Sequence, residues 1–181
     1  GRLSDAMMES ATANSVYTWE NNSIYYITNG IWSPLKRVDD GWGFWDGVRS
    51  ANLFLENFDP KVLERFQYNE DYDEMIDKAS KFSLEVRFLR AFYLFELAKR
   101  YGDIPLIART YTQEESNSVR KTSFADVIDF IAKECTEITR EGGLPEDGVR
   151  GETGRVTKGA ALALKSRALL YAASDLHNPA H

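Results

Sequence analysis

The stretch that decides the fold is EVRFLRAFYLFELAKRYGDIPLI, residues 85–107. All positions from 88 to 98 are apolar except Arg90 and Glu96, and a helix drawn at about 100° per residue is expected to carry these two on one thin polar seam. A helix with so little polar surface must be covered by neighbours on more than one side. The sequence therefore predicts a buried central helix.

The C-terminal end of this helix has its own signals. Gly102 can adopt a left-handed C-cap without the steric cost of a Cβ atom. Pro105 disfavours helical backbone at the residue before it. We expect the helix to run over about 77–101 and to end sharply there.

Three further segments have helical patterns. Apolar residues in 43–58 recur every three or four positions, which is typical of an amphipathic helix. Residues 123–141 begin with the capping residue Ser123 and continue with a regular apolar face. Residues 157–174 begin with Thr157, a second capping residue, and are rich in alanine, whose small side chain lets two helices approach closely. We expect this last helix to lie deep in the core.

The segments between these helices are expected to be less regular. Residues 3–8 have a weak helical pattern, and residues 61–76 form a second helical or looped segment. The Asn-Asn and Asn-Gly turn signals of 17–34 predict an ordered loop, in which 24–27 could form a short extended piece. Residues 112–122 are polar and predict a loop.

The predicted helices form two successive antiparallel pairs, 43–58 with 77–101 and 123–141 with 157–174. Each pair exposes an apolar side that the next pair can cover, as in solenoids. The connections are unequal, so no strict repeat period is present. We predict an all-α, irregular helical-repeat fold with long ordered loops, and the length of 181 residues favours a single domain.

Composition excludes several functions. The net charge is −6 and no Lys/Arg run is present, which disfavours nucleic-acid binding. Cys135 lies on the apolar face of a predicted helix, where a small core residue is expected. His177 and His181 are separated by Pro179, so they do not form a metal-binding helix turn. We expect no metal, no cofactor and no membrane-spanning segment.

The charged residues of the central helix need a separate interpretation. Glu85, Arg87, Arg90 and Glu96 lie among large apolar residues, and glycoside hydrolysis would need two carboxylates that face a sugar. Arginines within reach favour a structural network of paired charges instead. Asn52, on the first helix, is expected to be a buried residue that hydrogen-bonds backbone between helices. We therefore predict that the chain is not an enzyme.

Three blocks resemble one protein family. EVRFLRAFYLFELAKRYGDIPLI (85–107) is similar to the signature helix of the SusD/RagB family of outer-membrane nutrient-binding lipoproteins. GRVTKGAALALKSRALLYAAS (154–174) is similar to that family's next conserved helix, and WGFWDGVRSANLFLENF (42–58) resembles its first core helix. The blocks stand in the family's order, and together they cover about a third of the chain.

The resemblance implies a tetratricopeptide-like scaffold and a surface-exposed lipoprotein of the cell outer membrane. Such a protein binds oligosaccharide or a related nutrient and delivers it to a SusC-like TonB-dependent transporter. Family members have a signal peptide and a lipid-bearing N-terminal cysteine that residues 1–181 do not contain. Either these segments were processed off or the chain is a fragment. Because the chain also stops at His181, well before such proteins end, we expect it to be the N-terminal portion of one longer SusD-like domain. The resemblance does not name the glycan.

The candidate ligand contacts lie in an aromatic N-terminal region. All four tryptophans fall between positions 19 and 45, and an aromatic face flanked by Asn or Arg suits a sugar ring, which has an apolar face and a rim of hydroxyls. Packing in a small satellite core is the other interpretation, and we expect it for Trp42 and Trp45, in the first turn of a helix. The hypothesis is that glycan contacts come from Trp32, Arg37, Asn29, Trp19 and Tyr26.

Two functions of other classes are kept as alternatives. A soluble helical-repeat adaptor would bind protein segments in a concave groove. An α-helical glycoside-processing enzyme would release reducing ends from polysaccharide.

Overall fold

The structure is a computed structural model that describes residues 9–18, 22–33, 35, 41–140, 143–146 and 153–178. The chain divides into two compact units, 1–41 and 42–181. The described residues are helical and contain no β-strand beyond isolated bridges, which confirms the predicted all-α class. That all 181 residues belong to one domain remains a prediction.

The smaller unit contains one described helix, α2 (Ser23–Thr28). The Asn22 side chain accepts a hydrogen bond from the Tyr25 N–H at 3.1 Å and so caps the helix. The ordered loop predicted over 17–34 is wrong in part: the described residues on either side of α2 are loop, but 24–27 are helical, because this cap and the burial of Ile24 outweigh the strand preference of the sequence. The predicted helix at residues 3–8 lies outside the described residues.

The larger unit begins with three helical elements: α3 (Phe44–Asn57), the 3-10 helix η1 (Pro60–Phe66) and α4 (Tyr72–Tyr101). α3 matches its prediction closely. α4 begins at Tyr72, before the predicted position 77. Asp73 and Glu74 lie in its first turn, where their negative charges interact favourably with the positive end of the helix dipole and stabilise this earlier start. α4 ends as predicted, since Gly102 caps it with φ of 68°.

The second half of the larger unit contains α5 (Gln113–Ser118), α6 (Phe124–Ile138) and α7 (Lys158–Ala172). The loop predicted over 112–122 is wrong in part, because Thr112 and Glu115 form a capping box that starts the short α5. The predicted caps of the other two helices are confirmed: Ser123 accepts from the Asp126 N–H, and Thr157 accepts from the Ala160 N–H.

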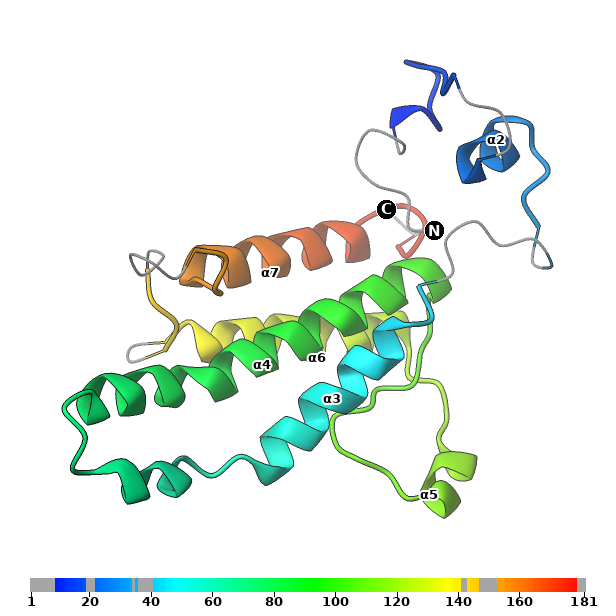
Figure 1. The fold of residues 1–181 in the computed structure, drawn as a ribbon. Coiled ribbons are helices and arrows are strands. Elements are labelled where there is room, and N and C mark those ends of the chain that lie inside the picture. Colours follow the sequence, from blue (N-terminus) through cyan, green and yellow to red (C-terminus); the bar gives the residue numbers. More distant parts are fainter. Residues whose placement is uncertain are drawn as a thin grey trace. The chain divides into compact units, whose positions relative to one another are not determined.

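The four long helices pack as the two predicted pairs. α3 packs against α4, α6 packs against α7, and α4 joins the two pairs through α6 (Figure 1). A long loop connects α4 to α6 and carries α5, apart from the helical layers (Figure 1). An isolated antiparallel bridge between Ile104 and Thr122 ties the two ends of this loop together.

α4 forms the centre of the core, as predicted. Five of its residues are completely shielded from solvent and belong to one hydrophobic cluster with α3, α6 and α7: Ala91, Leu94, Phe95, Leu97 and Ala98. The prediction that Arg90 and Glu96 share one polar seam is wrong. They are six positions apart, which places them about 240° apart around the helix, and they contact different partners. Cys135 is buried in the same cluster, which confirms its core role.

α7 is less deeply buried than predicted. Ala161, Leu164 and Ala168 form one buried face that packs on α6. Leu162, Leu169 and Leu170 are exposed on other faces. The small alanine side chains therefore allow close packing on one side of α7 and do not bury the whole helix.

None of the helices within the described residues is both long and apolar enough to cross a bilayer.

Candidate functional site

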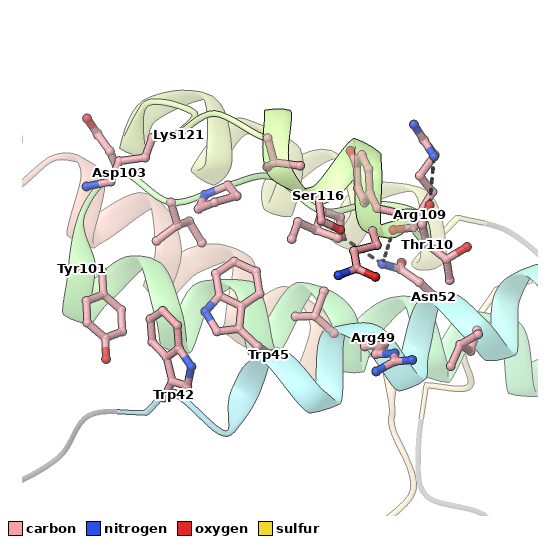
Figure 2. A pocket seen from close by; sticks show the side chains of 18 residues that line it. Trp42, Trp45, Arg49, Asn52, Tyr101, Asp103, Arg109, Thr110, Ser116 and Lys121 are labelled. Carbon is pink, nitrogen blue, oxygen red and sulfur yellow. Dashed lines mark hydrogen bonds between the residues drawn. The ribbon is translucent and has the colours of Figure 1, made fainter.

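A cleft of about 1120 Å³ lies in the larger unit and is called the α3 cleft below. One wall is formed by α3 and the end of α4, and the other by the loop from 103 to 121 (Figure 2). Both walls belong to the 42–181 unit, so the cleft is defined by that unit alone.

Three aromatic side chains form one end of the α3 cleft. Trp42 meets Trp45 edge to face, with ring centroids 6.5 Å apart and planes at 72°. It meets Tyr101 in the same way, at 5.9 Å and 87°. Trp42 is nevertheless 60% exposed, so the expectation that it packs in a core is wrong, whereas the half-buried Trp45 does pack against the core. The result is an aromatic wall held by its own edge-to-face contacts.

The loop wall is held by side chains of the helical frame. The Asn52 amide donates to the carbonyl oxygens of Ile107 and Arg109, both at 3.1 Å. Arg90 donates from Nη1 to the carbonyl of Ala108 at 2.8 Å. These bonds confirm that Asn52 ties backbone to the helices, and they place a stretch with no regular secondary structure against α3.

A charge network behind Arg90 fixes this arrangement. Arg90 Nη2 pairs with Glu134 Oε2 at 3.0 Å, and Arg87 pairs with both oxygens of Glu134 and with Glu137. Burial alone would raise the pKa of Glu134, but the hydrogen bonds and charges of the two arginines outweigh it and hold the pKa below its usual range. The predicted structural pairing of the α4 charges is confirmed, although they do not form one network: Glu85 pairs with Arg155, and Glu96 pairs with Lys99 and Arg100. Neither Glu85 nor Glu96 lines the α3 cleft.

Carboxylates also anchor the far end of the loop. Glu115 accepts from Arg109 at 2.8 and 3.2 Å, and these bonds lower the pKa of Glu115 to about 2. Glu56 accepts from the N–H and the hydroxyl of Thr110, which lowers the pKa of its carboxyl. Both carboxylates are therefore ionised near neutral pH, and the charge of Arg109 is neutralised by Glu115.

The sequence-predicted contacts belong to the smaller unit. Trp32 is 60% exposed and follows Ile31, whose N–H donates to the carbonyl of Tyr26 at 3.0 Å. Asn29 is the C-cap of α2, and its amide donates to the carbonyl of Tyr25. The α2 turn thus brings Tyr26, Asn29 and Trp32 into one short segment. Trp19 and Arg37 lie outside the described residues, and a ligand role for all five remains a prediction.

The α3 cleft was not predicted as a site. The spacing of Trp42, Trp45 and Arg49 by three and four positions is a local signal that they share one helix face. Tyr101 and Lys121 join them only through the tertiary fold, and no local pattern could place them there. In the part of the chain that the structure describes, no group of three or more potential metal ligands occurs.

Comparison with known proteins finds matches among solved structures. No protein-family model matches the sequence, and no curated protein matches it significantly. Solved structures do match. A SusD-like protein from Bacteroides fragilis NCTC 9343 is 34% identical over 74% of this chain, with a TM-score of 0.57. A SusD-like carbohydrate binding protein from the same organism is 28% identical over 84% of the chain, with a TM-score of 0.63.

A laminarin binding SusD-like protein is 27% identical over 82% of the chain, also with a TM-score of 0.63. The chain spans between 24% and 30% of the length of these three structures. The helical frame and these matches define a tetratricopeptide-like scaffold of paired helices. The chain belongs to the SusD-like family, as its sequence blocks predicted.

Proposed function

We propose that the chain is part of a carbohydrate-binding protein and that a saccharide binds in the α3 cleft. The observation that carries this proposal is the aromatic wall of Trp42, Trp45 and Tyr101. Trp42 contacts the other two rings edge to face, yet 60% of its surface stays exposed and is available to a ligand. The similarity to SusD-like structures described as carbohydrate binding and laminarin binding supports the ligand class.

The shape and chemistry of the cleft suit an oligosaccharide. Small-molecule pockets hold about 300–1,000 Å³, and the α3 cleft, at about 1120 Å³, is open enough for several linked sugars. The C–H face of a sugar ring can stack on an indole, while hydroxyls on its rim need donors and acceptors. Gln113 and Ser116 of α5 line the opposite wall and supply such groups.

We further propose that the whole protein is a surface-exposed lipoprotein of the cell outer membrane that delivers its ligand to a SusC-like TonB-dependent transporter. The family resemblance supports this role. The proposed mechanism is binding and release with no covalent step. The α4 carboxylates Glu85 and Glu96 are paired with cations of the protein.

The experiment compares two tryptophan variants of the complete protein. Calorimetric titration with starch, laminarin and other soluble polysaccharides identifies a ligand, and Trp42→Ala is then expected to weaken its binding by about tenfold or more. The α2 prediction is tested by Trp32→Ala, and Tyr68→Ala, an exposed aromatic outside the cleft, is the control. Unchanged affinity in Trp42→Ala contradicts the cleft assignment, and release of reducing ends by the wild type contradicts a purely binding role.

A further inference from the structure

We infer that the α3 cleft selects saccharides that carry anionic substituents, such as the carboxylates of uronic acids or sulfate esters. This inference rests on the proposed function and adds the charge of the ligand to it. Its basis is a pair of cations, Arg49 and Lys121, that line the cleft near the aromatic wall.

Neither cation is neutralised by the protein around it. Within the described residues, neither Arg49 nor Lys121 makes an ion pair or a side-chain hydrogen bond, in contrast to Arg109, which Glu115 holds by two bonds. Both side chains are exposed. They can therefore pair with a ligand without first breaking an internal contact.

The carboxylate in the cleft lining forms no ion pair with either of these described cations. Asp103 is the acidic residue among the described residues that line the cleft, and its Oδ1 accepts from the N–H of Phe124 at 2.8 Å. It thus caps the start of α6. Glu56 and Glu115 are likewise committed to Thr110 and Arg109.

The two cations come from opposite walls. Arg49 follows Trp45 by one helical turn on α3, whereas Lys121 comes from the loop and lies beside Asp103, near Tyr101 (Figure 2). A saccharide stacked on the aromatic wall would have one cation available on each side. That arrangement favours a chain with repeated anionic groups over one with a single charged end.

Arg49 and Lys121 carry a charge opposite in sign to the net charge of the chain. The net charge is −6, so a polyanion is repelled at long range and would not bind this surface without a specific site. Binding of an anionic saccharide would therefore indicate a specific site such as the cleft, because the net charge of the chain does not attract polyanions.

The test titrates the complete protein with matched sets of acidic and neutral polysaccharides: polygalacturonate, alginate and chondroitin sulfate against galactan, laminarin and starch. We expect the tightest ligand to be acidic and its affinity to fall as NaCl rises. Arg49→Gln and Lys121→Gln should each weaken it by about two- to fivefold. The controls Arg140→Gln and Lys133→Gln, exposed cations outside the cleft, should leave it unchanged.

The outcomes separate this inference from the proposed function. If neutral polysaccharides bind more tightly and Trp42→Ala abolishes that binding, anionic selectivity is wrong and carbohydrate binding in the cleft stands. If an acidic ligand binds and neither Arg49→Gln nor Lys121→Gln changes its affinity, its charge is recognised elsewhere and the inference fails. If no polysaccharide binds, both fail together.

Discussion

Arg90 and Asn52 form a buried clamp: Arg90 Nη1 donates to Asn52 Oδ1 at 2.9 Å, and both side chains then hold the loop from 107 to 109 by its carbonyl oxygens. The clamp joins the α4 and α3 helices to one wall of the α3 cleft. It therefore couples the stability of the helical frame to the geometry of the candidate site.

Replacement of Asn52 should expose this coupling. Asn52→Leu keeps an apolar side chain of similar size but leaves Arg90 Nη1 short of one acceptor and two loop carbonyls without donors. A buried polar group left unsatisfied costs about 1–3 kcal/mol, so we expect the free energy of unfolding to fall by about 2–4 kcal/mol in urea denaturation. Asn57→Ala, an exposed asparagine on the same helix, should change it by less than about 0.5 kcal/mol. Equal effects would show that Asn52 has no special role.

Glu134 should make stability depend on pH. Its folded pKa is held below the ordinary value of 4.5, so its stabilising contribution is present above that pH and is lost as pH falls through the folded pKa. Glu134→Gln should lower the free energy of unfolding at pH 7 by about 3 kcal/mol, as when a buried ion pair loses one partner. The variant should also lose less stability than the wild type between pH 7 and pH 3.

Glu74→Gln is the control for this pair of effects. Glu74 pairs with Lys78 on the surface of the same unit, where such pairs contribute about 0–1 kcal/mol. A wild-type stability that is flat below pH 4.5, or a Glu134→Gln profile parallel to it, would contradict the role of Glu134. Thermal or urea denaturation measured at several pH values gives the answer.

Gly47 is required by the packing of α3 on α4. A Cβ atom at this position would lie 2.6 Å from the Tyr93 ring, which also contacts the rings of Phe44 and Phe92 at centroid distances of 5.9 Å. Overpacking costs about 1–3 kcal/mol, and the gain in helix propensity from alanine offsets up to about 1 kcal/mol. We expect Gly47→Ala to destabilise the protein by about 1–2 kcal/mol.

The matched control for this substitution lies in another helix. Gly159→Ala on α7 places its Cβ atom no closer than 3.8 Å to its nearest neighbour, Thr157 Oγ1, so only the gain in helix propensity remains. Thermal denaturation should show opposite signs for the two variants. The same sign for both would mean that Tyr93 moves aside freely.

Cys135 should be unreactive in the native protein. Its side chain is completely shielded from solvent, and burial together with the nearby Glu134 charge raises the pKa of the thiol to about 11. At pH 8 a thiol-specific reagent should react with it only in denaturant, at a rate set by unfolding. Rapid reaction without denaturant would contradict its place in the core.

The sequence predicted the helical frame well because the frame depends on periodicity and caps, which are local. α3, α6 and the caps at Gly102 and Ser123 appear where expected, and α4 ends where expected although it begins before position 77. The failures have equally physical causes. α2 forms because one asparagine cap and one buried isoleucine outweigh strand preference, and α7 buries only one side because composition does not specify orientation.

The candidate site was harder to predict because it is assembled from distant segments. Trp42 was expected to pack like Trp45, yet its ring lies at the edge of α3 where nothing in the larger unit covers it fully. Tyr101 and Lys121 are separated from α3 by more than forty residues: Tyr101 reaches the cleft through the packing of α4 on α3, and Lys121 through the path of the loop. A glycan contact by Trp32 of the smaller unit remains a prediction.

The clamp contacts only main-chain oxygens of the loop strip, and every residue type supplies that atom. Exchange of Ile107, Ala108 or Arg109 would leave Asn52 and Arg90 with their acceptors, although Ile107 also packs against the core and Arg109 also pairs with Glu115. A frame of this kind separates anchoring from recognition. Substitutions at Ile107 and Arg109, which line the cleft, would therefore change what the protein captures without releasing the loop from the clamp.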